Sequence, residues 1–138
     1  MIQYITEELV MPTMPKQKLS QWIKSVARIY GKKVGEIAYI FCTDERILEV
    51  NNQYLQHDYY TDIITFDYSS ESTISGDIFI SVDTVKSNAQ EFNVSFEEEL
   101  SRIIIHGILH LCGQDDKTPT LRAEMTEKEN QALSWKKF

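Results

Sequence analysis

The chain has 138 residues, of which 42% are apolar and 25% charged, and its 21 Asp and Glu against 14 Lys and Arg give a net charge of −7. This acidic, mixed composition excludes a general nucleic-acid coat, a collagen-like chain and an intrinsically disordered one. A chain of this length can bury a core without disulfides, so we expect one domain over residues 1–138.

The hydrophobic pattern predicts strands and helices in alternation along the first half of the chain. Ile2–Ile5 has the composition of a short strand. Apolar residues at helical spacing predict an amphipathic helix over about residues 16–30. A strand rich in β-branched and aromatic residues follows over residues 34–42, and Thr43 is a suitable N-cap for a helix that reaches about Tyr54.

The second half of the chain predicts a hairpin followed by three helices. The strands of the hairpin are expected over residues 62–68 and 76–82, with a polar turn between them. The three helices are expected from an Asp83 cap to about Phe92, from a Ser95–Glu98 capping box toward Leu111, and from Thr118–Pro119 onward. The mixture predicts an α+β fold with α/β-type layers, in which a small mixed sheet packs with several helices and the strongly apolar second helix is central.

The charge is distributed unevenly along the chain. Residues 1–35 have a net charge of +4, whereas residues 36–138 have a net charge of −11. Lys24 and Arg28 lie one helical turn apart, so the first helix could present a basic stripe to a polyanion or simply a solvated face.

The cysteines and the N-terminus indicate the cellular compartment. Cys42 and Cys112 stand 70 positions apart in apolar surroundings, which fits neither a disulfide framework nor a Cys-x-x-Cys metal site. No stretch approaches the ~18 apolar residues of a membrane span, and no basic segment precedes an apolar one at the N-terminus. We therefore expect a cytoplasmic protein with reduced thiols that does not bind a membrane.

Two of the three histidines are placed to bind a metal. His106 and His110 lie four residues apart on the predicted central helix, with β-carbons about 6 Å apart on one face. Gly113 allows the chain to leave the helix and bring Asp116 back toward the same point. Two imidazoles and one carboxylate leave a fourth tetrahedral position for water, so we predict one Zn²⁺ per chain, held by His106, His110 and Asp116. Three protein ligands favour a catalytic site over a closed structural one.

The spacing His-x-x-x-His-x-x-Gly-x-x-Asp also matches the zinc ligands of metzincin proteases. Those enzymes carry a Glu general base directly after the first His, where this chain has Gly107. Glycine has no side chain that accepts a proton, so a metalloprotease is only a minor alternative.

The histidine segment resembles the hallmark of the YbeY family of bacterial ribosomal-RNA maturation factors, which reads His-Gly-x-Leu-His-Leu-x-Gly-x-Asp-His. Residues 106–116, His-Gly-Ile-Leu-His-Leu-Cys-Gly-Gln-Asp-Asp, match it except at the end. A second family segment, Thr-Asp-Val-Leu-Ser-Phe followed by Gly-Asp-Ile, is similar to Thr61–Phe66 and Gly76–Ile78. The similarity extends over about residues 36–133.

The resemblance implies a metal-dependent, single-strand-specific endoribonuclease that matures ribosomal RNA, especially the 3′ end of the small-subunit RNA, and serves ribosome quality control. Its partners would be single-stranded and ribosomal RNA and the small ribosomal subunit with its proteins. The rival from another class is a non-catalytic ribosome-assembly or RNA-binding factor with a structural metal. Asp62 and Asp77 lie in the matching segments, where caps and braces of turns are the simpler interpretation.

Two positions depart from the family pattern. Asp116 stands where the family has its third metal-binding His, with Asp115 as a competing ligand. An aspartate lowers the charge of metal plus ligands from +2 to +1, so we expect an altered metal preference and not the loss of the site. Leu55 stands where the family has an Arg, and it cannot neutralise a phosphate. His57 is a weak candidate for a catalytic proton shuttle, or else a solvated loop residue, and no general base can be named.

Overall fold

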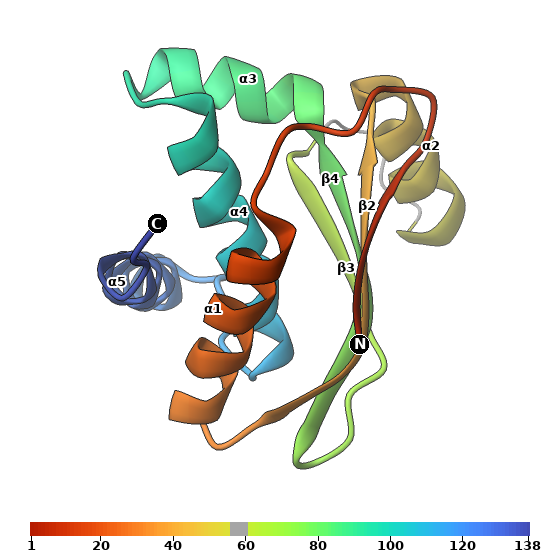
Figure 1. Cartoon of the computed structure of the whole chain (residues 1–138). Coiled ribbons are helices and arrows are strands. Elements are labelled where there is room, and N and C mark those ends of the chain that lie inside the picture. Colours follow the sequence, from red (N-terminus) through yellow and green to blue (C-terminus); the bar gives the residue numbers. More distant parts are fainter. Residues whose placement is uncertain (56–60) are drawn as a thin grey trace.

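Within residues 1–55 and 61–138, which the computed structural model describes, four strands and five helices follow one another (Figure 1). The strands are β1 (Ile2–Thr6), β2 (Lys33–Cys42), β3 (Ile63–Asp67) and β4 (Thr73–Ser81). The helices are α1 (Lys16–Ile29), α2 (Asp44–Leu55), α3 (Val82–Glu91), α4 (Phe96–Leu111) and α5 (Pro119–Ser134). Among these described helices, none combines the length and apolarity needed to cross a membrane.

The strands form one mixed sheet in the order β1-β2-β4-β3. β1, β2 and β4 are parallel, and β3 pairs with β4 in the antiparallel hairpin that the sequence predicts. Gly76 sits opposite Asp67 in that hairpin, where a β-carbon would overlap the carbonyl oxygen of Phe66. The hairpin leaves β3 at the edge of the sheet, in contact with α4, the helix that carries His106 and His110.

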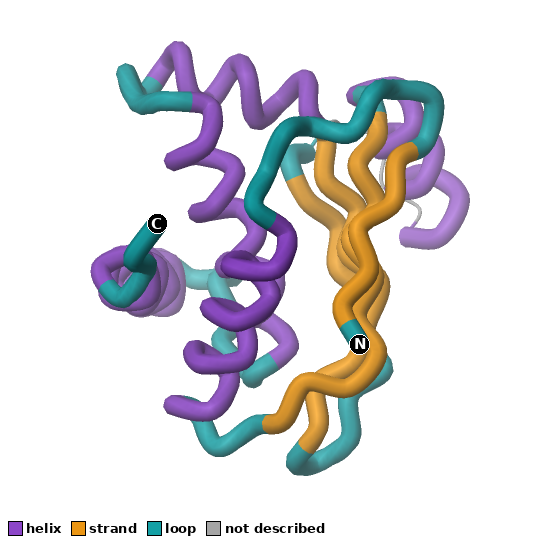
Figure 2. The backbone as a smooth tube through the Cα atoms, in the orientation of Figure 1, coloured by secondary structure: helices purple, strands orange, loops and turns teal. Residues whose placement is uncertain are grey.

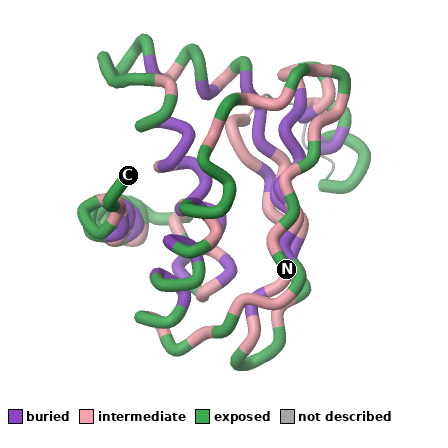
Figure 3. The backbone as a smooth tube through the Cα atoms, viewed as in Figure 1, coloured by how far each residue is buried: buried purple, intermediate pink, exposed green. Residues whose placement is uncertain are grey.

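Helices cover both faces of the sheet. Figures 1 and 2 show α1 and α4 on one side and α2 on the other, with α5 outside α4. Alternate residues of β4 serve the two sides: Ile78 and Ile80 belong to the large core with α1 and α4, whereas Phe79 packs on the smaller core under α2. Figure 3 shows buried segments of α4 and of the sheet facing each other. The predicted α+β class and the central position of α4 are confirmed.

One predicted helix start is wrong. Asp83 does not cap α3, because β4 runs directly into the helix and Ser81 takes the N-cap position, where its hydroxyl accepts the backbone N–H of Thr84 at 3.2 Å. The Asp83 carboxylate instead accepts the backbone N–H of Asp44 at the start of α2, at 3.0 Å. Both residue types are good caps, and the end of the strand decides between them. The predicted Ser95 cap is confirmed by its hydrogen bond from the backbone N–H of Glu98.

Candidate metal centre and neighbouring cleft

The position of α4 on the sheet depends on a glycine next to the first histidine. An added β-carbon at Gly107 would lie 3.0 Å from Cδ1 of Ile78 and 3.2 Å from Cδ1 of Ile63. The helix therefore approaches β3 and β4 closely at this point, while His106 and His110 project from its half-buried side. The same contact leaves no room for the glutamate that a metzincin carries at this position.

The turn after α4 returns the chain toward the histidines. Gly113 has φ +106°, in the region that glycine adopts without strain, and Gln114 follows with its backbone N–H donating to the carbonyl of Leu109 at 3.0 Å. The buried Gln114 side chain braces this turn, because its Oε1 accepts from Nζ of Lys128 on α5 at 2.6 Å. Asp116 lies two residues beyond this braced position.

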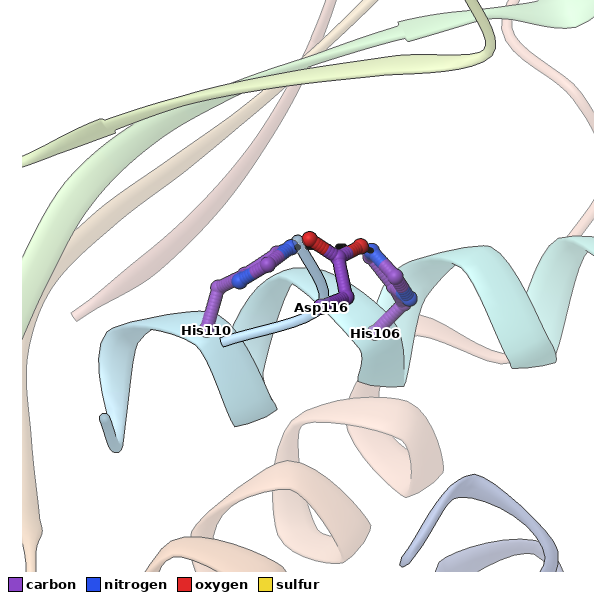
Figure 4. Close-up of side chains that lie close together, drawn as sticks. All are labelled: His106, His110 and Asp116. Carbon is purple, nitrogen blue, oxygen red and sulfur yellow. Dashed lines mark ion pairs between the residues drawn. The ribbon is translucent and has the colours of Figure 1, made fainter. Parts of the chain in front are cut away.

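Asp116 meets both histidines at one point (Figure 4). Its Oδ2 is 3.4 Å from Nε2 of His106 and 3.4 Å from Nε2 of His110. These separations exceed the ~2.7–3.2 Å of a good N–H···O hydrogen bond. They fit the edge of a ligand tetrahedron, since metal–ligand bonds of about 2.0–2.1 Å place neighbouring ligand atoms about 3.3–3.4 Å apart. The ligand atoms all lie within 4.8 Å of one another, so this group can hold a metal ion.

Both imidazole rings are held through the nitrogen that faces away from Asp116. Nδ1 of His110 lies 2.8 Å from the carbonyl oxygen of Gln114, which can only accept, so this nitrogen carries the proton. Nδ1 of His106 lies 2.6 Å from Oε2 of Glu129 on α5. With Nδ1 as the donor in each ring, the lone pair of Nε2 is available toward Asp116.

Carboxylates around His106 change its proton affinity. Burial is the largest influence and lowers the pKa of His106, but the hydrogen bond with Glu129 and the nearby negative charges together raise the pKa above 6.5. Asp62 is one of these neighbours, and burial raises its own pKa although the charge of His106 acts in the opposite direction. In the metal-free protein, protons therefore compete for the same histidine that a metal would use.

A cleft of about 370 Å³ lies beside His110. Its lining includes Leu55 at the end of α2, and Thr61, Thr65 and Asp67 on or next to the edge strand β3. Leu55, at the position where the resemblance leads us to expect an arginine, therefore lines the same cleft as a candidate metal ligand. The lining of this cleft mixes apolar side chains, among them Leu55, Ile63 and Ile64, with polar ones.

The remaining predicted site residues lie outside the cluster. Asp115 is exposed, and its Oδ1 accepts the backbone N–H groups of Asp116 and Lys117 at 2.7 and 3.2 Å, so it braces the turn. Asp77 on β4 accepts the Tyr68 hydroxyl at 3.3 Å. His57 lies outside the described residues.

Sequence reasoning missed Glu129, which touches His106 directly. Glu129 is only 7% exposed and shares the inner face of α5 with Met125 and Ala132. These three positions are spaced three to four residues apart, as expected for one buried helix face. The sequence signal that could have identified Glu129 is therefore a charged residue at a position of this buried face.

Four of the six basic residues of the N-terminal region gather where α1 ends and β2 begins. Lys24, Arg28, Lys32 and Lys33 line a hollow of about 410 Å³. Lys32 and Lys128 both act on the thiol of Cys112, lowering its pKa against the stronger effect of burial, so these two ammonium groups lie near the end of α4. The predicted basic stripe thus continues from α1 toward the helix that carries the histidines.

Comparisons with known proteins identify the family. The family model described as endoribonuclease YbeY matches residues 4–136. The endoribonuclease YbeY of Phocaeicola vulgatus is 62% identical over 134 residues, covering 97% of each chain, and that of Bacteroides fragilis is 60% identical over 136 residues, covering 99% of this chain and 98% of its own. The solution structure of TM1509 from Thermotoga maritima is similar at 30% identity with a TM-score of 0.68, covering 97% of this chain and 87% of that one. The predicted resemblance is confirmed, and the chain belongs to the endoribonuclease YbeY family.

Proposed function

We propose that this chain is a metal-dependent endoribonuclease that cuts single-stranded RNA during ribosomal-RNA maturation, at the 3′ end of the small-subunit RNA, and in ribosome quality control. Membership of a family named for endoribonuclease activity supports a hydrolase of RNA phosphodiester bonds. The observation that carries the site is Oδ2 of Asp116, 3.4 Å from Nε2 of both His106 and His110. The partners would be the small ribosomal subunit and its proteins, which implies work in the cytoplasm.

The donor set favours Zn²⁺, one per chain, held by His106, His110 and Asp116. When bound, such an ion polarises a phosphoryl oxygen and makes water more acidic. The protein contributes two neutral imidazoles whose Nδ1 groups are already bonded, so neither ring has to turn to present Nε2. The aspartate in place of a third histidine reduces the positive charge at the site, which we expect to shift the preference among metals.

RNA would lie along the cleft beside His110 and contact the basic hollow with its phosphates. The edge-strand side chains Thr65 and Asp67 give the cleft hydrogen-bonding groups for an unstacked nucleotide. Lys24, Arg28 and two neighbouring lysines would contact phosphates on an otherwise acidic molecule. Leu55 supplies no cation in the cleft, so this chain depends more on the basic hollow than a family member with arginine there.

Salt dependence tests the basic hollow. Four phosphate contacts predict that the logarithm of the affinity for single-stranded RNA falls with the logarithm of salt concentration at a slope of about −2.8. The double variant Lys24→Gln with Arg28→Gln should reduce the steepness by about 1.4, as measured by fluorescence anisotropy. Lys86→Gln, on α3 and away from the hollow, is the matched control. Equal slopes for all three proteins would contradict this use of the hollow.

Cleavage tests the activity itself. Wild-type protein is freed of metal with a chelator, then assayed on single-stranded and duplex RNA before and after Zn²⁺ is added back, alongside His110→Ala. We expect cleavage of the single strand only, restored by Zn²⁺ in the wild type and absent in the variant. Bound metal without cleavage would favour the assembly-factor function. Cleavage of casein would support a protease, against which stands Gly107, where Ile78 occupies the space of a general base.

A further inference from the structure

The two candidate histidine ligands are oriented by different kinds of group. His110 is held by a backbone carbonyl of its own turn, whereas His106 is held by the carboxylate of Glu129, 23 positions later on α5. A carbonyl fixes the ring, but a carboxylate both fixes the ring and makes Nε2 a stronger electron donor. The two histidines therefore differ in what supports them.

Glu129 is placed for this support and for no ligand role of its own. It is 7% exposed, its Oε2 lies 2.6 Å from Nδ1 of His106, and its Oε1 accepts from Nη1 of Arg102 at 2.8 Å. Asp116 stands on the opposite, Nε2 side of the same ring. Because the ring separates the two carboxylates, Glu129 cannot reach the point that Asp116 shares with the histidines.

Arg102 holds the carboxylate in turn. Its Nη2 donates to Oδ1 of Asn130 at 2.7 Å, so the guanidinium contacts two consecutive residues of α5. Arg102 lies four residues before His106, one turn earlier on α4. Arg102, Glu129 and His106 thus form a connected series of hydrogen bonds between α4 and α5, which ends at the imidazole of a candidate metal ligand.

We propose that Glu129 is a positioning residue for the metal centre, which sets the orientation and donor strength of His106 through Nδ1. This inference rests on the proposed function, since it needs the cluster of His106, His110 and Asp116 to hold a metal. Losing a group that hydrogen-bonds to a metal-binding histidine weakens metal affinity by about 10-fold to 100-fold. The affinity loss in Glu129→Gln should fall in this range. The carboxylate accepts from the histidine with one oxygen and from the arginine with the other, whereas the amide is neutral and has an NH₂ donor in place of one of these oxygens.

The test is a competition titration of Zn²⁺ against a chromophoric chelator, on full-length metal-free proteins whose folding is checked by circular dichroism. Two variants serve as controls. Arg102→Met removes the ion pair between Arg102 and Glu129 but leaves the hydrogen bond between Glu129 and His106. Glu127→Gln removes an exposed charge from α5. We expect the Zn²⁺ affinity to fall by about 10-fold to 100-fold in Glu129→Gln, by less than about threefold in Arg102→Met, and not at all in Glu127→Gln. The visible spectrum of the Co²⁺ form should shift in Glu129→Gln alone, because the donor strength of one ligand has changed.

Each contrary outcome has a separate meaning. Folded Glu129→Gln that binds Zn²⁺ within about twofold of wild type would overturn the positioning role and leave the proposed function intact. Equal losses in Glu129→Gln and Arg102→Met would also overturn it, since the ion pair would then act only by holding α5 in place. A wild-type protein that binds no Zn²⁺ would refute the metal centre itself, and with it this inference.

Discussion

Replacing Gly107 by alanine tests how closely α4 must approach the sheet beside the candidate metal centre. Two effects of opposite sign compete. Alanine stabilises a helix interior by about 1 kcal/mol relative to glycine. Its methyl group would lie 3.0 Å from Cδ1 of Ile78 and 3.2 Å from Cδ1 of Ile63, inside the usual ~3.5–4.0 Å carbon–carbon distance.

The crowding should outweigh the helical gain. Overpacking a core by one methyl group costs about 1–3 kcal/mol when the neighbours cannot move freely, and Ile78 is fully buried. We predict a net loss of about 1 kcal/mol in the free energy of unfolding, or about 3–5 °C in Tm for a chain of this size. Ile78→Val removes the nearest atom, at its own cost of about 1 kcal/mol. The double variant should therefore lose about 0.5–1 kcal/mol less than the sum of the single losses.

Urea unfolding of the metal-free protein, followed by tryptophan fluorescence, measures these differences. Ala123→Gly on the exposed side of α5 serves as the control, because it reports the helical preference of alanine without a packing contact. A stabilised Gly107→Ala protein would refute the close-approach argument. Strict additivity in the double variant with Ile78→Val would refute it as well.

The reactivity of the cysteines, a buried hydrogen bond of Trp22 and metal binding at low pH provide further tests. Burial, the largest influence on both thiols, raises the pKa of Cys42 to about 12 and that of Cys112 to about 11. Iodoacetamide at pH 8 should therefore alkylate the native protein at least about 100-fold more slowly than a free thiol, and the rate should rise with pH. Rapid labelling at pH 8 would contradict this. Trp22→Phe removes the 2.9 Å hydrogen bond from Nε1 to the carbonyl of Ala132 and should cost about 1–3 kcal/mol in urea unfolding, whereas an unchanged midpoint would show that the bond does not hold α5. Because the pKa of His106 is raised, protons compete with metal for this ring as the pH falls through that pKa. Protonation of this one ligand should lower the Zn²⁺ affinity about tenfold per pH unit, protonation of a second ligand would make the fall steeper, and a flat titration would contradict the histidine ligand.

The candidate site could be predicted because its signals are local in sequence. The four-residue spacing of His106 and His110 fixes their common helix face, and Gly113 permits the left-handed turn that returns Asp116. The choice between Asp115 and Asp116 depends on the turn itself, in which the backbone N–H of Asp116 donates to Oδ1 of Asp115. Spacing alone could not show which carboxylate points inward.

The parts that escaped prediction depend on contacts between distant segments. Glu129 reaches His106 only after α5 has packed on α4. The periodicity of α5 marks Glu129 as a carboxylate on a core face, but it does not identify His106 as the partner. The sheet order β1-β2-β4-β3 is another such case, because periodicity identifies strands without pairing them. Ser81, and not Asp83, is the N-cap of α3. Both are residue types that cap helices well, and the position at which β4 ends decides between them.

The most direct test of the central claim is the Zn²⁺ stoichiometry and affinity of the wild type, Asp116→Ala and Asp115→Ala, measured by competition titration. The geometry predicts about one Zn²⁺ per chain in the wild type. Loss of a residue that only supports a ligand weakens metal affinity by about 10-fold to 100-fold, and the Zn²⁺ affinity of Asp116→Ala should fall by more than this. The affinity of Asp115→Ala should stay close to that of the wild type. Full affinity in Asp116→Ala would contradict the assignment of this carboxylate, and a wild type without bound Zn²⁺ would contradict the metal centre.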